Sequence, residues 1–191
     1  HAPYSVSPPL LKRLAEWARA EGLPLMVHAA ESPEEVAFLA RGEGPLREVY
    51  GRFAKTPWTP PGTTPVRHLH ALGVLGPTTL LVHGVQVDEE EVGLLAETGT
   101  KVVLCPRSNA NLEVGEAPLA LYAKHGVELA LGTDSRGSSP DLDVKNEARF
   151  LWGRAEPRLL VRALTRGGYR ALGLPTPRLT RGTPLSLVHF L

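Results

Sequence analysis

Residues Thr79–Pro106 read TLLVHGVQVDEEEVGLLAETGTKVVLCP, and this stretch decides the fold. Two short apolar runs, Thr79–Gly84 and Lys101–Pro106, lie on either side of a segment with helical character. Asp88–Glu97 predicts a helix, because an acidic N-cap residue and acids in the first turn are followed by a stop at Gly99. Apolar runs without strict alternation predict strands buried on both faces. A strand, a helix and another strand in this order predict a parallel pair with a helical crossover.

The same pattern continues on both sides of this stretch. Two more apolar runs, Leu23–His28 and Glu128–Thr133, predict two more buried strands. Between the runs, amphipathic spacing, capping residues and proline at the first turn predict helices. These helices are expected at Pro8–Glu21, from Ser32 onward, and at Pro118–His125, Asp141–Gly153 and Pro157–Leu172. Residues Gly42–Pro65 are rich in Gly, Pro and Thr and predict a long loop with one short helix. The sequence therefore predicts an α/β fold with a parallel sheet.

Composition limits the class of protein. The 191 residues carry 21 Lys and Arg against 20 Asp and Glu, a net charge of +1, which argues against nucleic acid or an anionic membrane as partner. None of the apolar runs approaches the length of a membrane span. The single cysteine, Cys105, excludes an internal disulfide and suits a reducing cytosol. We therefore expect a soluble, cytoplasmic chain.

Metal-binding residue types follow three of the four predicted strands. His28 ends the first run, His83 follows TLLV, and Asp134 follows ELALGT. In parallel α/β folds the carboxyl ends of the strands form the functional edge, so these three side chains are expected to converge. Imidazole nitrogen and carboxylate oxygen suit Zn²⁺ or Fe²⁺. The sequence therefore predicts a site for one divalent metal, with Zn²⁺ preferred over Fe²⁺.

Further polar residues lie close to the same strand ends. Glu31 follows His28 by three residues, so its carboxylate can approach the site and move protons without binding the metal. The alternative is that Glu31 belongs only to the first turn of the next helix. Ser108 and Asn109, just past the third run, are placed to contact a ligand or to brace the loop. We interpret Cys105 as a small buried hydrophobe, because no cationic neighbour is evident.

A second histidine pair has the spacing of a metal motif. His68-Leu-His70 reads as HxH, which binds a metal on a strand because residues i and i+2 share a face there. Its context after Pro65 is helical, and residues two apart on a helix point in different directions. We therefore do not expect a metal at this pair.

The assembled motifs resemble the amidohydrolase superfamily, in particular its nucleobase and nucleoside deaminase and chlorohydrolase branch. The matching stretches are HAPYSVS at 1–7, VHAAES at 27–32, LLVHGVQVDEEEVGLLAETGTKVVLCPRSN at 80–109 and LGTDSRGSSPDLDVKNEARFL at 131–151. This resemblance implies a (β/α)₈ barrel with a mononuclear metal at its C-terminal face. The four runs then correspond to strands five to eight, the C-terminal half of the barrel, over residues 1–174. Residues 175–191 would begin a flanking small β-domain or a tail.

The resemblance also implies a role for each site residue. His28 and Asp134 bind the metal, and Asp134 also accepts a proton from the hydrolytic water. His83 orients the water and the ring substrate, and Glu31 passes a proton to the ring nitrogen. His1 matches a histidine that reaches toward the substrate in relatives. Ammonia or chloride would leave from an electron-poor ring carbon.

One departure from the family pattern shapes the expected function. Family members carry an HxH metal pair on the first barrel strand, and no such strand is found in this sequence. We therefore expect the chain to be the C-terminal part of a longer protein, to need the N-terminal remainder as its partner, and to bind metal and turn over poorly alone.

Three functions remain open at this stage. The first is a metal-dependent deaminase of an aminated purine-like ring or nucleoside derivative, of the adenosine, S-adenosylhomocysteine or aminodeoxyfutalosine type. The second is a chlorohydrolase or cyclic amidohydrolase of the same superfamily. The third is a non-catalytic half-barrel that binds a partner or forms a homodimer.

Overall fold

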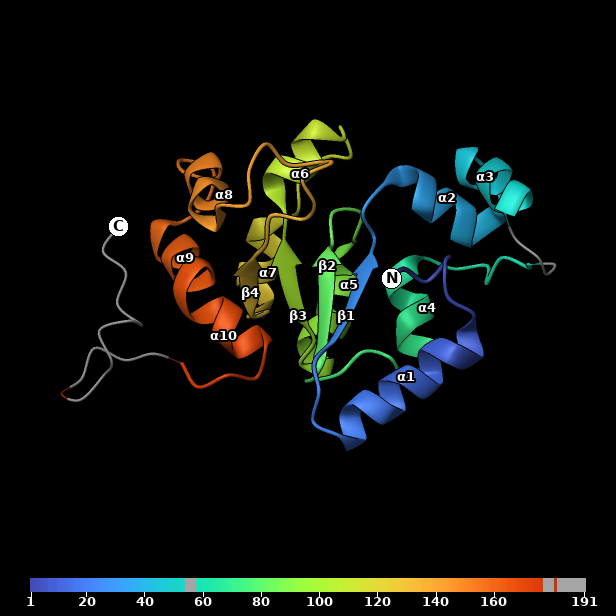
Figure 1. Cartoon of the computed structure of the whole chain (residues 1–191), viewed down its shortest axis with the longest axis horizontal. Helices are drawn as coiled ribbons and strands as arrows, with labels where there is room; N and C mark the ends of the chain where they lie inside the picture. The colour runs from blue at the N-terminus through green and yellow to red at the C-terminus, as the bar shows by residue number, and fades with distance from the viewer. Residues whose placement is uncertain (54–57, 177–180, 182–191) are drawn as a thin grey trace.

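A four-stranded parallel sheet forms the centre of the computed structural model, which describes residues 1–53, 58–176 and 181. The strands are β1 (Leu25–Ala29), β2 (Thr79–His83), β3 (Lys101–Leu104) and β4 (Leu129–Leu131), and they lie in chain order. Three of them fall within their apolar runs and β1 ends one residue beyond its run, so the four predicted strands are confirmed, but burial on both faces is wrong for β1, in which Met26 is exposed. Figure 1 shows their carboxyl ends at the same edge of the sheet, beside the beginnings of α2 and α6.

Helices fill the connections between and after the strands. They are α1 (Pro8–Ala20), α2 (Pro33–Arg41), α3 (Pro45–Phe53), α4 (Pro65–Ala71), α5 (Glu89–Thr98), α6 (Pro106–Asn111), α7 (Leu119–His125), α8 (Val144–Phe150), α9 (Pro157–Arg162) and α10 (Gly168–Ala171). The π-helical turn η1 (Ala163–Gly167) joins the last two. No helix in the described residues is both long enough and apolar enough to cross a membrane.

Helices α5 and α2 begin where the sequence predicts them. Asp88 caps α5 in a reciprocal capping box, in which its side chain accepts the Glu91 N–H and the Glu91 side chain accepts the Asp88 N–H. Ser32 caps α2 by accepting the Glu35 N–H at 3.2 Å. These caps end the preceding loops at fixed residues, so each helix starts a short distance after its strand.

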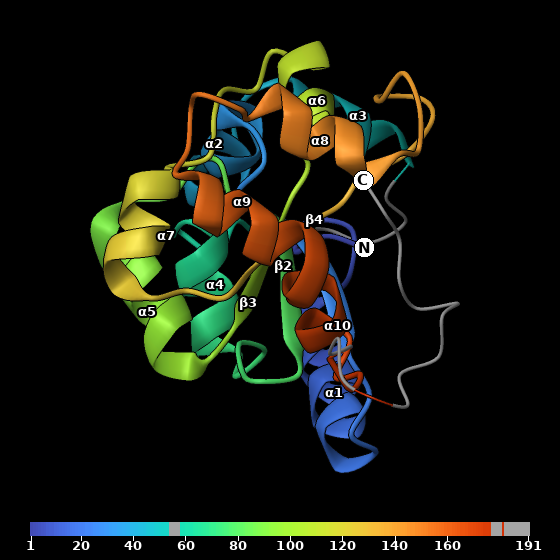
Figure 2. The ribbon, with the colours of Figure 1, turned by 90° about the vertical axis from the view of Figure 1, so that its left-hand side faces the viewer.

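One face of the sheet is buried, and the other is buried only in part, because Met26 of β1 is exposed on it. Val27, Leu81, Leu104 and Leu129 belong to the larger core cluster, which extends into α4, α5 and α7. Figure 2 shows these three helices on one side of the sheet. The alternate residues of the central strands form a smaller cluster on the opposite face, covered in part by Ala171 of α10. The strand residues of this smaller cluster are Leu80, Val82, Val103, Cys105 and Ala130. Met26 and His28 lie on the same face, because they align with Leu80 and Val82 of β2.

Three predictions about the helices need correction or extension. The helix expected at Asp141–Gly153 is shorter, Val144–Phe150, because the Asp143 side chain accepts the Lys145 N–H and starts the helix there. The helix expected at Pro157–Leu172 is interrupted by the π-helical turn η1. Helix α6 was not predicted at all. The flanking segment expected at 175–191 lies almost entirely outside the described residues.

Candidate active site

Three strand ends bring His28, His83 and Asp134 together. One ligand atom from each residue lies within 4.8 Å of the others. His28 and His83 lie near the ends of the paired strands β1 and β2, and Asp134 follows β4 by three residues. The predicted convergence of these side chains is therefore confirmed.

The backbone is strained where two of these residues lie. His83 has φ of 76° and Asp134 has φ of 59°, both in the left-handed region that residues with a side chain seldom adopt. Such a conformation costs of order 1–3 kcal/mol and persists only where surrounding contacts determine it. The hydrogen bonds around each side chain supply those contacts.

His83 is held by a single amide. Its Nδ1 lies 2.8 Å from Asn109 Oδ1, and both side chains are buried. An amide oxygen can only accept, so Nδ1 carries the proton in this contact. The other ring nitrogen, Nε2, lies 3.5 Å from Glu31 Oε1. The arrangement places one ring nitrogen of His83 beside a carboxylate that can exchange protons with it.

Asp134 is held by two hydroxyl groups. Ser108 Oγ and Ser138 Oγ each donate to Asp134 Oδ2 at 2.7 Å. Burial alone would raise the pKa of Asp134, but the hydroxyls of Ser138 and Ser108 and the nearby His83 lower it below its ordinary value. Asp134 is therefore a carboxylate at neutral pH, and Oδ1 receives neither of these hydroxyls.

His28 provides the clearest indication that a cation fits. Its Nδ1 is buried and has no hydrogen-bond partner among the described residues. Burial, followed by the neighbouring His83, lowers the pKa of His28, which favours the neutral imidazole that binds metals. An unsatisfied buried nitrogen costs about 1–3 kcal/mol, so a partner that is absent from the described residues, such as a cation, would stabilise the His28 ring. The donor set is that of a zinc or iron site.

His1 lies against the same group of residues. Its ring stacks on the His28 ring with 4.2 Å between centroids and 9° between planes. Its carbonyl oxygen accepts the His28 N–H at 2.9 Å. His1 is exposed, so its ring forms the outer wall of the site.

Glu31 lies between β1 and α2 and is anchored through its backbone. Its N–H donates to Glu35 Oε2 at 2.8 Å. Glu35 is almost fully buried, and this burial raises its pKa to about 7. The Glu31 side chain stays partly exposed, as a group that exchanges protons with a bound molecule must be. Glu31 directly precedes Ser32, the N-cap of α2, and its role in proton transfer stays a prediction.

Ser108 and Asn109 are both buried in α6, where they brace Asp134 and His83. Contact of either with a substrate stays a prediction.

Cys105 is buried, as predicted, and burial raises its pKa to about 12. His68 and His70 lie on helix α4, as predicted, with His68 buried and His70 exposed.

Two contributors were not found from the sequence. Ser138 follows Asp134 by four residues, a spacing that could have indicated a local hydroxyl donor. Glu35 follows Glu31 by four residues, but it reads as an ordinary acidic residue in the first turn of a helix. The roles of both depend on burial, which the local sequence does not show.

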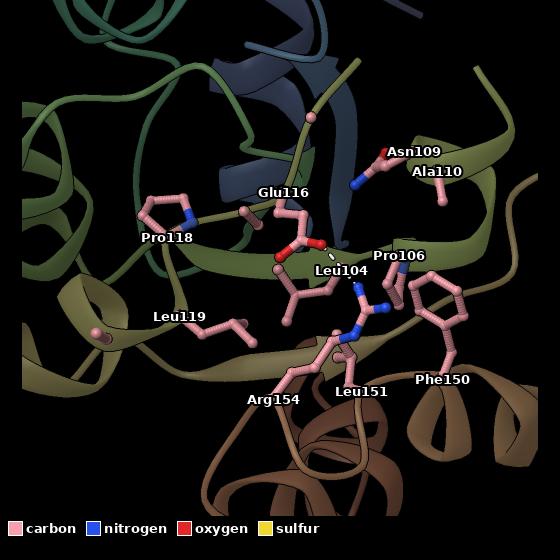
Figure 3. Close-up of a pocket in the computed structure, with 13 residues that line it drawn as sticks. Leu104, Pro106, Asn109, Ala110, Glu116, Pro118, Leu119, Phe150, Leu151 and Arg154 are labelled. Carbon is pink, nitrogen blue, oxygen red and sulfur yellow. Dashed lines mark hydrogen bonds and ion pairs between the residues drawn. The ribbon is translucent and has the colours of Figure 1, made fainter. Parts of the chain in front are cut away.

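A cavity of about 220 Å³ lies beside α6 and shares Asn109 with the site. Figure 3 shows the Asn109 amide nitrogen turned toward the cavity. Arg154 donates to Glu116 at 2.7 Å and lies over the Phe150 ring, 4.8 Å from its centroid. The other wall residues are largely apolar and include Leu104, Pro106, Pro118, Leu119 and Leu151. Among the described residues of the wall, the charged ones are Glu116 and Arg154, and they form an ion pair with each other.

Comparison with known proteins gives consistent matches. The model of the family described as "Amidohydrolase family" matches residues 1–190. The aminodeoxyfutalosine deaminase of Deinococcus radiodurans is 42% identical over 198 residues, covering 95% of this chain and 46% of the relative. The 5-methylthioadenosine/S-adenosylhomocysteine deaminase of Syntrophobacter fumaroxidans is 36% identical over 184 residues, covering 91% and 38%.

A solved structure agrees with these matches. An adenosine deaminase from Xanthomonas campestris with bound zinc superimposes with a TM-score of 0.73 at 31% identity, covering 91% of this chain and 38% of that one. The chain therefore spans less than half the length of the curated relatives described above.

Proposed function

Because the chain belongs to the amidohydrolase family, we propose that it carries the site of a metal-dependent hydrolytic deaminase. The observation that carries this proposal is the convergence of His28, His83 and Asp134 within 4.8 Å, with Glu31 beside His83. This set combines metal ligands with groups that move protons, which is what hydrolysis of a C–N bond requires.

His28 and Asp134 would hold the cation, with the imidazole nitrogen and a carboxylate oxygen as donors. When bound, a divalent cation supplies Lewis acidity that lowers the pKa of water toward neutrality. The relatives' zinc-bound structure supports Zn²⁺, and the donor set also accepts Fe²⁺.

The side chains of this chain then divide the proton transfers. Asp134, kept ionised by two hydroxyl groups, accepts a proton from the attacking water. Glu31 donates a proton to the ring nitrogen next to the attacked carbon, so charge does not build up on the ring. His83, fixed by Asn109, orients the water through Nε2. After the C–O bond has formed, Asp134 passes its proton to the amino group, the C–N bond breaks and ammonia leaves, and the proton of the new hydroxyl group returns to Glu31.

The names of the relatives support one class of substrate. Their names specify aminodeoxyfutalosine, 5-methylthioadenosine and S-adenosylhomocysteine, all adenine nucleoside derivatives. We propose a 6-aminopurine nucleoside derivative as the substrate, with the His1 side chain reaching toward it.

We also propose that β1 to β4 are strands five to eight of a (β/α)₈ barrel over residues 1–174, completed by further polypeptide that supplies additional metal ligands.

Ammonia release tests the proposal. The chain is supplied with Zn²⁺ and assayed alone and with the first half of the Deinococcus relative added as a separate polypeptide. The substrates are adenosine, 5-methylthioadenosine, S-adenosylhomocysteine and aminodeoxyfutalosine. We expect release from at least one of them, reduced about 10²–10⁴-fold by Glu31→Gln. No release from any of them, or chloride release from a chlorotriazine instead, contradicts the proposal.

A further inference from the structure

Glu147 is a buried carboxylate outside the candidate site. It lies on α8 with 0% of its surface exposed. A buried charge is costly unless it is paired and hydrogen-bonded, and an apolar residue could fill the same volume. Burial raises the pKa of Glu147 above its ordinary value, which is the sign of that cost. The contacts that Glu147 makes therefore indicate what it does.

These contacts lead to the beginning of α6. Glu147 Oε2 accepts the backbone N–H of Arg107 at 3.0 Å. Its Oε1 accepts from Ser139 Oγ at 3.4 Å and lies 3.7 Å from Arg107 Nη1. The Arg107 guanidinium in turn makes two bonds with Asp141, at 2.8 and 2.9 Å. Arg107 is thus fixed at its backbone by α8 and at its side chain by the loop before α8.

The two residues after Arg107 are Ser108 and Asn109. Ser108 donates to Asp134, and Asn109 accepts from His83. Helix α6 has only six residues, so a shift at its first turn moves both side chains together. The backbone contact at Arg107 therefore directly precedes the supports of two site residues that come from different strands.

We propose that Glu147 is a positioning residue for the metal site. It fixes the first turn of α6, and Ser108 and Asn109 transmit this placement to Asp134 and His83. This inference deepens the proposed function. It rests on that function in the measurement of Zn²⁺ binding, but not in the measurement on the metal-free protein.

A second buried glutamate provides a matched control. Glu91 on α5 is also almost fully buried, accepts a backbone N–H at 3.0 Å, contacts a threonine hydroxyl and lies 3.7 Å from an arginine nitrogen. Its partners are Asp88, Thr64 and Arg67, and among the described residues their hydrogen bonds and ion pairs do not reach His28, His83 or Asp134. Loss of Glu91 therefore reports the general cost of removing such a carboxylate.

The test compares Glu147→Leu with Glu91→Leu. Zn²⁺ affinity is measured by competition with a chromophoric chelator, and stability by denaturant unfolding. We expect Glu147→Leu to weaken Zn²⁺ binding about 10–100-fold, the usual effect of losing an outer support of a metal ligand. Glu91→Leu should lose similar stability and keep its affinity. Glu147→Gln retains an oxygen for the Arg107 N–H and should recover most of the affinity.

A second readout uses the metal-free protein. The Nδ1 proton of His83 is protected by Asn109, so ¹⁵N NMR should show it as a slowly exchanging ring signal. We expect this signal to broaden or disappear in Glu147→Leu and to persist in Glu91→Leu. If wild-type protein binds no Zn²⁺, the proposed function fails while this NMR comparison still decides the inference.

The inference is overturned if both Leu variants change affinity and the ring signal equally, or if neither changes them. Should either Leu variant not fold, Glu147→Met and Glu91→Met carry the comparison, because Met is close to Glu in volume and has no acceptor oxygen. A broader ring signal and weaker binding in Glu147→Met than in Glu91→Met would then support the inference, and equal values would overturn it.

Discussion

Gly84, the residue after His83, shows how closely the site is packed. It has φ of +56°, and its carbonyl accepts from Tyr122 Oη at 2.5 Å. A Cβ added at Gly84 would overlap with that same hydroxyl oxygen. Glycine is therefore required both by the backbone conformation and by the approach of a buried tyrosine.

Gly84→Ala should destabilise the fold by about 2–4 kcal/mol, from left-handed strain together with the overlap. Denaturant unfolding measures this loss. Tyr122→Phe alone should cost about 1 kcal/mol, because it removes one hydrogen bond. The double variant should lose less stability than the sum of the losses of the two single variants, because Tyr122→Phe removes the oxygen with which the new Cβ overlaps. Additive losses would contradict the steric explanation.

Glu35 makes stability depend on pH. Its pKa is about 7 in the folded chain against an ordinary value of 4.5, because burial penalises the charged form. The folded state therefore binds more protons than the unfolded state between these values, and stability falls as pH rises through this window. Glu35→Gln should equal wild type near pH 4 and be more stable near pH 8, by up to about 3 kcal/mol.

Unfolding at both pH values checks this prediction. Glu90→Gln serves as the control, because Glu90 is well exposed and should show no such difference. If the stability difference between Glu35→Gln and wild type is the same at both pH values, Glu35 does not titrate in the window given.

At the scale of elements, η1 depends on one close contact. A Cβ on Gly167 would overlap with the Leu129 carbonyl oxygen of β4, while a Cβ on Gly168 meets nothing within 4 Å. The π-helical turn thus brings the helix backbone directly against a strand.

These neighbouring glycines form a matched pair. Gly167→Ala should destabilise by about 3 kcal/mol or more, because neither backbone can move without disturbing β4. Gly168→Ala should be neutral or stabilise by up to about 1 kcal/mol, the helix preference of Ala over Gly. Thermal or denaturant unfolding separates them, and similar effects at both positions would show that the contact is not tight.

The strands and most helix beginnings could be predicted because their signals are local. Apolar runs mark β1 to β4, and Ser32 and Asp88 cap the helices that follow them. Helix α6 could not be predicted, since it has only six residues, beginning with Pro106, and they carry no apolar periodicity. The π-helical turn depends on the approach of Gly167 to β4, which is a tertiary contact.

In the candidate site too, residues with a local sequence signal could be predicted, and residues whose roles depend on tertiary contacts could not. Residue type and place at a strand end were enough to predict His28, His83 and Asp134. The supports of these residues, among them Ser138 and Glu35, depend on side-chain burial and on partners from other segments. Their roles therefore required the folded structure.

For the whole molecule, the parallel sheet assembles a site from residues more than a hundred positions apart. Such a site exists only in the folded chain, so a cation that binds it stabilises the fold by RT ln(1 + [L]/Kd), about 2.7 kcal/mol at one hundred times Kd. We expect the Tm to rise with Zn²⁺ concentration and to fall back when a chelator removes the metal.

Variants at the histidines show where the stabilising Zn²⁺ binds. His28→Gln should abolish the rise in Tm, because it removes the buried nitrogen that lacks a partner. His70→Gln should leave it unchanged, since His70 is exposed on α4 and points away from His68, two residues earlier on the same helix. Loss of the rise in His70→Gln with retention in His28→Gln would place the metal at the helical HxH pair and refute the site at the strand ends.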